Sequence, residues 1–255
     1  LIIMDVISCI PKIIHYCWLG GKPFPPEIQS CIDTWSRVMP DYRIKCWDEN
    51  SLDLQSIAFT REALAEKKWS LVSDYVRLYA LYTEGGIYFD TDVIVYKGFD
   101  RFLEHDFFSA VEYHADFFEA QGKYQLDSDG RPFDSRTYVA GMGLLVALMG
   151  AKKGNPFVKE LLDFFGSIHF IQPDGTLFMD VIHPAIAAKH LEGYGFVYKN
   201  ELQRLPGNIV IYPSSVFASS RQTHTPENYA VHCVTGSRRD TRLQRIDRRV
   251  RHWFR

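Results

Sequence analysis

Short apolar runs alternate with apolar residues at helical spacing along the N-terminal part of the chain. Residues 12–19 form a β-branched and aromatic run closed by Gly20 and Gly21, which predicts a buried strand. Pro25-Pro26 opens a segment with apolar residues at helical spacing, and residues 42–47 form a second strand-like run. This order of strand, helix and strand predicts an α/β fold with a mostly parallel central sheet.

The most informative segment is a helix followed by an acidic strand. Apolar residues recur at helical spacing from Ser70 to Glu84, and Gly85-Gly86 predicts that this helix ends with a residue in the left-handed αL conformation. Residues 87–96 then read Ile-Tyr-Phe-Asp-Thr-Asp-Val-Ile-Val-Tyr, an apolar strand interrupted by two carboxylates. Because a buried strand does not carry acidic side chains without partners, the interruption indicates a functional site.

Asp90 and Asp92 have the spacing of a metal-binding pair. Residues two apart in an extended strand point to one side, so these carboxylates would lie about 7 Å apart and could hold Mg²⁺ or Mn²⁺. The carboxyl ends of strands in α/β sheets form ligand crevices, which favours this pair over Asp127-Ser-Asp129, a predicted solvated turn. The alternative for Asp90 and Asp92 is a hydrogen-bonded strand end without a metal.

The later part of the chain continues the same pattern. An apolar segment spans residues 138–151, Asn155-Pro156 begins a helix, and residues 210–213 and 229–234 are predicted late strands. No linker, charge block or repeat divides the chain, so we assign residues 1–237 to one domain.

Charge and cysteine content set limits on partners and compartment. A net charge of −2 argues against a broad basic face for nucleic acid. The five cysteines contain no CxxC pair, which suggests a reducing compartment rather than a disulfide framework or a thiolate zinc site.

The opening residues lack a basic segment and reach Pro11 too soon for a signal peptide. We therefore expect a cytoplasmic protein, or one attached only to the inner face of the cell membrane.

Residues 238–255 form a predicted basic amphipathic helix of the same domain. Eight arginines stand against Asp240 and Asp247, while apolar residues fall on one helical stripe. One interpretation is peripheral contact with an anionic membrane surface, where a lipid-linked acceptor would be found. The other is that the stripe packs on the domain and the arginines are solvated.

Several of these segments together resemble a known enzyme family. These segments are Ile10–Gly20, Ser73–Asp92, Gly150–Pro156, His169–Gly175, Ile211–Phe217 and His232. Through them the chain resembles the DXD-containing sugar transferases of glycosyltransferase family 32, which include bacterial capsule and surface-polysaccharide enzymes and are related to the glucosylating domains of large clostridial toxins.

The resemblance implies a Rossmann-like α/β fold of the GT-A type and a metal-dependent site. It implies that Asp92 ligates Mn²⁺ (or Mg²⁺) and that Asp90 contacts the water shell of the metal and the hydroxyls of a nucleotide-sugar donor. His232 matches the late histidine that completes the metal site. The alternative for His232 is a structural core histidine.

Further donor contacts follow from the same resemblance. Asp74 and Arg77 would contact donor hydroxyls and phosphate from one helix face, or would form only an ordinary ion pair. Trp18 would pack on the donor base, or would be a core tryptophan. Ser237 and Arg238 stand where similar enzymes have a different sequence, and we take them as possible stand-ins for the diphosphate contacts.

The implied reaction retains the anomeric configuration of the donor sugar. We expect transfer of a hexose or N-acetylhexosamine from a UDP-sugar, or alternatively from GDP-mannose, to a glycan or lipid-linked glycan acceptor in surface-polysaccharide synthesis. Front-face attack, in which the leaving phosphate helps to deprotonate the acceptor, is favoured over a covalent glycosyl-enzyme. Variable loops build acceptor sites in such folds, and residues 112–136 are the expected loop here.

Two rival functions fit parts of the pattern. A haloacid-dehalogenase-like phosphatase also has an apolar strand ending in DxD, but the sequence contains no Asp-Asp pair for the later metal ligands of that class. A non-catalytic sugar-nucleotide binder is the second rival.

Overall fold

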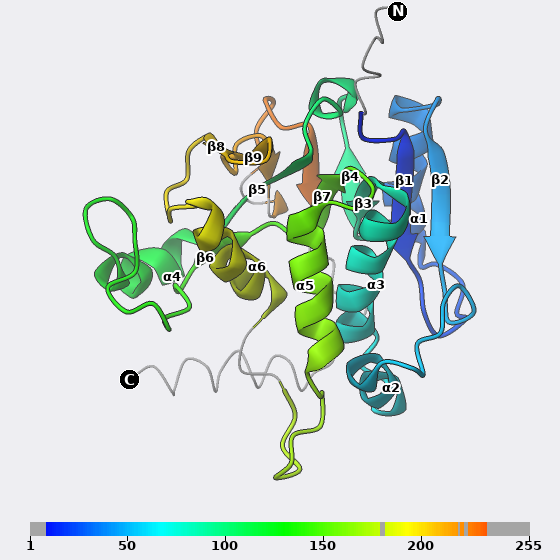
Figure 1. Ribbon diagram of the computed structural model, residues 1–255. Helices are drawn as coiled ribbons and strands as arrows, with labels where there is room; N and C mark the ends of the chain where they lie inside the picture. The colour runs from blue at the N-terminus through cyan, green and yellow to red at the C-terminus, as the bar shows by residue number, and fades with distance from the viewer. Residues whose placement is uncertain (1–8, 179–181, 219, 222–223, 234–255) are drawn as a thin grey trace, which may run out of the picture.

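The central element of the computed structural model is an eight-stranded sheet, and the structure describes residues 9–178, 182–218, 220–221 and 224–233 (Figure 1). The strand order is β2-β1-β3-β7-β5-β9-β8, with β6 paired to β5. The strands of this sheet are β1 (Ile13–Cys17), β2 (Arg43–Trp47), β3 (Gly86–Phe89), β5 (Phe107–Tyr113), β6 (Met142–Leu144), β7 (Leu148–Ala151), β8 (Gln203–Leu205) and β9 (Ile209–Tyr212).

Most strands of this sheet run in one direction. β1 pairs in parallel with β2 and β3, and β5 pairs in parallel with β9. β7 lies antiparallel between β3 and β5, so β3 and β5 run the same way and end at the same edge of the sheet. β6 and β8 are the other reversed strands. The predicted α/β class with a mostly parallel sheet is confirmed.

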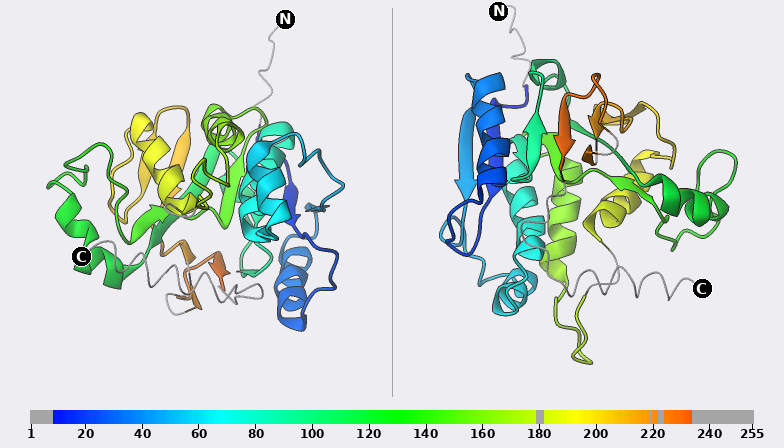
Figure 2. Two further views of the ribbon diagram at one scale, coloured as in Figure 1. Left: turned by 90° about the horizontal axis from the view of Figure 1, so that it is seen from below. Right: turned by 180° about the vertical axis from the view of Figure 1, so that it is seen from behind.

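A smaller sheet and the helices cover the two faces of the central sheet (Figures 1 and 2). The smaller sheet has the order β10-β11-β4 and lies with α1 on one face. Its strands are β4 (Val93–Val95), β10 (Phe217–Ala218) and β11 (Ala230–His232). The helices are α1 (Pro26–Val38), α2 (Ala58–Ala65), α3 (Trp69–Glu84), α4 (Ala115–Ala120), α5 (Pro156–Ser167) and α6 (His183–Leu191), with 3₁₀ turns η1 (Asp100–Phe102), η2 (Gly122–Gln125) and η3 (Glu192–Tyr194).

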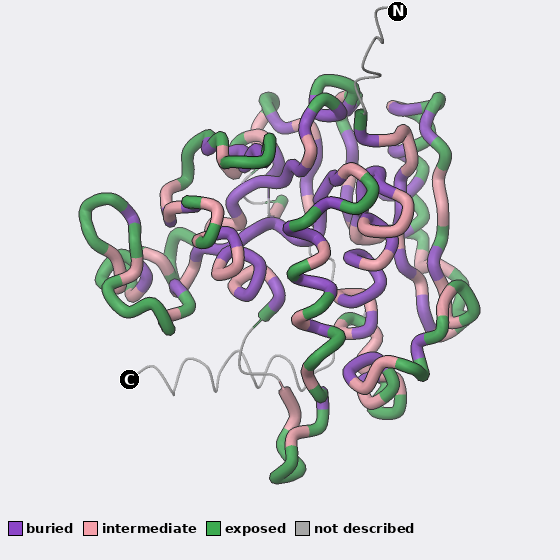
Figure 3. Tube along the Cα trace, in the orientation of Figure 1, coloured by how far each residue is buried: buried purple, intermediate pink, exposed green. Residues whose placement is uncertain are grey.

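The strand β3 shows how the layers are held together. Side chains alternate across a strand, and Tyr88 packs into the core beneath α3 and α5, whereas Ile87 and Phe89 pack into the core beneath α1 and β4. All four residues of β3 are buried, and the burial of the surrounding chain is visible in Figure 3. Burial on both faces explains why this strand reads as a continuous apolar run.

The helix ends follow the sequence signals in most details. Pro26 begins α1, and the side chain of Asn155 caps α5 by accepting a hydrogen bond from the backbone N–H of Val158. α3 ends at Gly85, as predicted, but with φ 69° and ψ −179°. The αL prediction is therefore wrong in ψ: Gly85 adopts a conformation that is essentially restricted to glycine and turns the chain directly into β3.

The acidic segment differs from the predicted single strand. β3 ends at Phe89 and β4 begins at Val93, so Asp90 and Asp92 lie in the turn between two strands. The backbone N–H of Val93 donates to the carbonyl of Asp90 at 3.0 Å and closes this turn. The apolar pattern continues across the break because β4 is itself buried, in the smaller sheet.

No helix among the described residues combines the length and the apolar character that crossing a bilayer requires.

The contact between β1 and the start of β3 can be tested by substitution. A Cβ added at Gly86, which has φ 115°, would lie 2.6 Å from the carbonyl oxygen of Ile13 and 3.0 Å from His15. We expect Gly86→Ala to lower the free energy of unfolding by about 2–3 kcal/mol in denaturant titration. Gly166→Ala is the control, because it adds a Cβ to α5 in open space and should raise stability by about 0.5 kcal/mol. Equal stability of Gly86→Ala and the parent would contradict this account.

Candidate active site

The turn after β3 holds two carboxylates at the carboxyl edge of the sheet. Its first residue is fixed by the backbone N–H of Asp90, which donates to the carbonyl of Ala147 at 2.8 Å. Its last residue is fixed by the carbonyl of Asp92, which accepts from the N–H of Cys233 at 2.9 Å. Asp90 and Asp92 are thus oriented by a turn, and the predicted strand alternation is not the reason that their carboxylates lie together.

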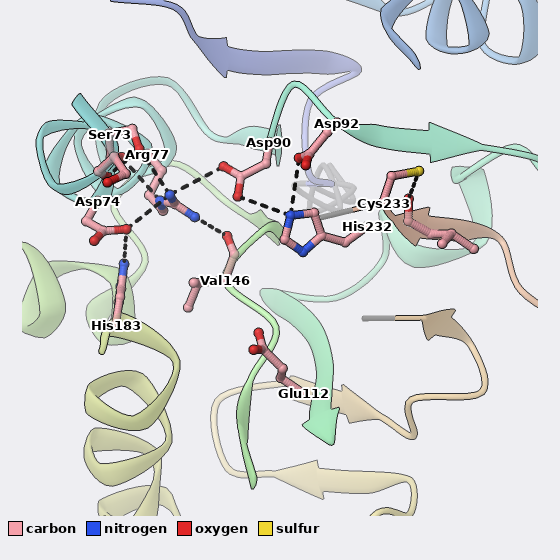
Figure 4. Close-up of polar contacts among 12 residues, drawn as sticks. Ser73, Asp74, Arg77, Asp90, Asp92, Glu112, Val146, His183, His232 and Cys233 are labelled. Carbon is pink, nitrogen blue, oxygen red and sulfur yellow. Dashed lines mark hydrogen bonds and ion pairs between the residues drawn. The ribbon is translucent and has the colours of Figure 1, made fainter. Parts of the chain in front are cut away.

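Antiparallel pairing of β4 with β11 brings a third group to this turn. His232 lies opposite Val93 in the ladder, which places its ring beside the residue that precedes Val93. The Nε2 atom of His232 lies 3.2 Å from Oδ1 of Asp92 and 3.9 Å from Oδ2 of Asp90 (Figure 4). The predicted convergence of these three side chains is what the structure shows.

The three side chains are suited to a divalent cation. One ligand atom from each of Asp90, Asp92 and His232 lies within 4.8 Å of the other two. Two carboxylate oxygens and an imidazole nitrogen suit Mn²⁺ well, and the carboxylates suit Mg²⁺. A donor set of three leaves coordination positions for diphosphate oxygens and water.

Electrostatics of the site favour a bound positive charge. Burial tends to lower the pKa of His232, but its hydrogen bond to Asp92 and the charges of Asp92, Asp90 and Glu112 raise this pKa to about 9. Burial raises the pKa of Asp90, although the positive charges of Arg77 and His232 oppose that change. Without a metal, His232 is therefore protonated at neutral pH and supplies positive charge to the two carboxylates.

Arg77 of α3 lies behind Asp90 and is almost completely buried. Its guanidinium contacts Asp90 at 3.3 Å and Asp74 at 3.0 Å, and it donates to the carbonyl of Val146 at 2.8 Å. It also contacts the carbonyl and hydroxyl of Ser73. Burial tends to lower the pKa of Arg77, but Asp90, Tyr88 and Asp74 raise it above its usual value. We infer that Arg77 positions Asp90. A direct contact of Arg77 with a nucleotide-sugar donor stays a prediction.

Asp74 is held from two sides. Its Oδ1 atom contacts Arg77 and also accepts from Nδ1 of His183, at the start of α6, at 3.0 Å. The i,i+3 ion pair anticipated as the alternative is thus present, within a larger network that also includes Asp90. No motif in the sequence marks His183, because its position beside α3 depends on the packing of α6.

Trp18 lies one residue beyond β1 and is partly buried. Its ring packs against Phe24 with centroids 4.6 Å apart, and its Nε1–H donates to the carbonyl of Lys22. Trp18 is not part of the fully buried core, and its stacking on a donor base stays a prediction. Ser237, Arg238 and the basic segment 238–255 lie outside the described residues.

The second DxD match is a turn, as predicted. Oδ1 of Asp127 accepts hydrogen bonds from the backbone N–H groups of Asp129 and Arg131, and both acids are exposed. A carboxylate that caps its own turn needs no metal to explain it.

Glu112 is a further acid that faces the site. It lies near the end of β5, with its side chain 15% exposed, and its carboxylate points toward His232 in Figure 4. From sequence, Glu112 was only the first residue of the expected acceptor loop. No motif in the sequence marks Glu112, because a single glutamate at the end of an apolar strand has no distinctive spacing.

A known protein-family model matches the part of the chain that contains the turn after β3. Residues 25–109 match the family model described as "Glycosyltransferase sugar-binding region containing DXD motif". This segment is similar to the sugar-binding region of DXD-containing glycosyltransferases. The matched segment includes Asp74, Arg77, Asp90 and Asp92 and ends before Glu112 and His232, which the fold adds to the site. The predicted family resemblance is confirmed.

One curated relative aligns with a longer part of the chain than the family model does. The chain is 27% identical over 202 residues to "Inositol phosphoceramide mannosyltransferase 3" of Schizosaccharomyces pombe (strain 972 / ATCC 24843). The aligned part covers 70% of this chain and 46% of the relative, so the chain spans less than half the length of that protein.

Solved structures that are similar to the chain include sugar transferases. The "PaToxG Glycosyltransferase" structure has a TM-score of 0.46 and 19% identity, covering 73% of this chain and 70% of that one. A structure of galactosyltransferase LgtC with donor and acceptor sugar analogs has a TM-score of 0.42 and 13% identity, covering 92% and 93%.

The raised pKa of His232 predicts how metal affinity depends on pH. A metal must displace the proton from Nε2, so Mn²⁺ affinity measured by calorimetry should rise about tenfold per pH unit below pH 9 and level off above it. His232→Gln should bind Mn²⁺ more weakly and with a flatter pH dependence. A parent protein whose Mn²⁺ affinity does not change between pH 6 and pH 8 would contradict the role of His232.

The buried network around Arg77 predicts a stability effect. Arg77→Met leaves Asp74 and Asp90 without their shared cation, and we expect the free energy of unfolding to fall by about 3 kcal/mol. Arg43→Met is the control, since the side chain of Arg43 is 63% exposed in its pair with Glu84 and should change stability by less than about 1 kcal/mol. Similar unfolding curves for the two variants would rule out the proposed role of Arg77.

Proposed function

We propose that the protein is a metal-dependent glycosyltransferase that uses a nucleotide-sugar donor. The observation that carries this proposal is the convergence of Asp90, Asp92 and His232 at the carboxyl end of β3, with the acidic pair inside the matched sugar-binding region. An α/β fold with an acidic turn at this edge is what we expect of the GT-A type. The phosphatase alternative receives no support from the family match.

The residues of the chain have distinct parts in this proposal. Asp92 and His232 hold the cation, and Asp90 reaches both the cation and the donor hydroxyls. A bound Mn²⁺ or Mg²⁺ supplies Lewis-acid stabilisation of the charge that develops on the departing diphosphate. Arg77 and Asp74 keep Asp90 in place, and Trp18 is our candidate for stacking on the donor base.

The substrates are proposed by class. A UDP-sugar is favoured by the family resemblance, and the mannosyltransferase relative is a reason to test GDP-mannose beside it. The acceptor is a glycan or a lipid-linked glycan, and we place the reaction in surface-polysaccharide synthesis. We propose transfer with retention through front-face attack on the donor sugar.

Cellular placement is proposed from the sequence. Residues 238–255 carry the basic amphipathic pattern that suits an anionic membrane, which would put the enzyme at the inner face of the cell membrane. Liposome flotation of the full chain and of a chain lacking residues 238–255 tests this, because equal binding by both would remove its support.

Substitution of Asp92 tests the proposed function. Calorimetry would measure the affinity of UDP and GDP with and without Mn²⁺, and chromatography would measure hydrolysis of UDP-glucose, UDP-galactose, UDP-N-acetylglucosamine and GDP-mannose. We expect Asp92→Asn to lose at least about a hundredfold in Mn²⁺-dependent nucleotide affinity, since partners of metal ligands alone are worth 10–100-fold. Asp129→Asn, at the exposed second DxD, is the matched control and should behave as the parent.

The outcomes separate the candidate functions. Manganese-dependent donor hydrolysis that is lost in Asp92→Asn supports the transferase. Saturable nucleotide binding without turnover of any donor would identify the non-catalytic binder. Full manganese-dependent affinity and turnover in Asp92→Asn would overturn the proposal.

A further inference from the structure

The end of β5 lies at the same sheet edge as the acidic turn. β3 and β5 run in the same direction because each pairs antiparallel with β7. Ligands bind at the carboxyl edge of such sheets. Glu112 lies next to the last residue of β5, as Asp90 directly follows β3. The topology therefore places a second carboxylate-bearing strand end beside the proposed metal site.

The surroundings of Glu112 leave its carboxylate available to a ligand. Its Oε1 atom accepts a hydrogen bond from Nε2 of His114 at 2.9 Å. Within the described ranges, Glu112 forms no ion pair with lysine or arginine, and its Oε2 atom accepts no hydrogen bond. Its side chain is only 15% exposed, so solvation by bulk water is restricted. A partly buried acid without a lysine or arginine partner is a candidate for a functional site.

The position of Glu112 differs from that of the metal-binding set. The described metal-binding group consists of Asp90, Asp92 and His232, and Glu112 is not a member. Figure 4 shows the Glu112 carboxylate below the His232 ring, with no contact drawn to that ring. Its charge nevertheless acts on His232, which places the carboxylate within electrostatic range of the cation site.

We propose that Glu112 binds the attacking hydroxyl of the acceptor and accepts its proton during transfer. This inference rests on the proposed function. The acceptor oxygen forms a bond to the anomeric carbon, and the bond from that carbon to the diphosphate oxygen breaks, with its electron pair going to the diphosphate. The hydroxyl proton goes to Oε2 of Glu112, whose Oε1 remains hydrogen-bonded to His114. In this form of the front-face attack, Glu112 rather than the leaving phosphate removes the proton.

The chain that follows Glu112 suits a sugar acceptor. Residues 114–141 connect β5 to β6 and include α4, which projects from the central sheet in Figure 1. Four of the exposed large apolar side chains are aromatic rings of this connection: Phe117, Tyr124, Phe133 and Tyr138. Aromatic rings with a few polar groups at one end are the usual surroundings of a bound organic ligand. These rings suit the acceptor class of the proposed function, a polyhydroxylated glycan.

Water can serve as the acceptor in the test, so the natural acceptor need not be identified. Each protein would be incubated with Mn²⁺ and the four nucleotide sugars named above, and donor hydrolysis would be followed by chromatography. Calorimetric titration of UDP and GDP in Mn²⁺ reports the donor site separately. We expect Glu112→Gln to lower hydrolysis about a hundredfold, the scale of general-base catalysis, with nucleotide affinity within twofold of the parent.

A matched control is available elsewhere in the chain. Glu62 of α2 is 16% exposed and contacts His169 at 2.7 Å, so it matches Glu112 in burial and in having a histidine partner. It differs from Glu112 in also contacting Arg61 and the backbone N–H of Ile171. Glu62→Gln should hydrolyse donor at the parental rate. Formate, a small carboxylate, should restore part of the hydrolysis by Glu112→Ala, which loss of a purely structural contact would not allow.

Each contrary result has a defined meaning. A parental rate of hydrolysis in Glu112→Gln would overturn the inference alone. A loss of more than tenfold in manganese-dependent nucleotide affinity in that variant would indicate that Glu112 is a metal ligand. A glycosyl adduct on Glu112 found by mass spectrometry would indicate that it is a nucleophile. Either result would overturn the inference. A parent protein without manganese-dependent nucleotide binding would overturn the proposed function and this inference together.

Discussion

The site depends on two carboxylates that repel each other and are nevertheless held together. Asp90 and Asp92 share one turn, and their repulsion is offset by Arg77 on one side and by His232 on the other. Arg77 is buried and cannot leave, whereas His232 can exchange its proton for a metal. A fixed cation behind the pair and a replaceable positive charge in front of it make the turn a candidate site for a divalent ion.

The fold supplies this arrangement through backbone pairing rather than through side-chain flexibility. The glycine pair after α3 lets β3 start against β1, and the N–H of Asp90 is tied to the chain between β6 and β7. The β4–β11 ladder then brings in His232 from the far end of the described chain. Three segments distant in sequence are thus fixed by hydrogen bonds between main-chain atoms, which suits a site that must hold its geometry while substrates exchange.

The elements that depend on local chemistry can be predicted from the sequence. The apolar periods of α3 and β1, the proline at the start of α1 and the asparagine cap of α5 are local signals, and all appear in the structure. The break after Phe89 was missed because β4 is buried in a different sheet, so the apolar run does not stop. The placement of His183 beside Asp74 and the orientation of Glu112 could not be predicted from sequence for a similar reason, because both depend on packing between distant segments. His232 was found only through family resemblance.

The most direct test of the central claim is a crystal structure with Mn²⁺ and UDP, measured at the manganese absorption edge. The account predicts one anomalous peak among Asp90, Asp92 and His232, with a diphosphate oxygen also bound to it. A nucleotide bound with its diphosphate elsewhere, or no manganese peak at these three residues, would contradict it.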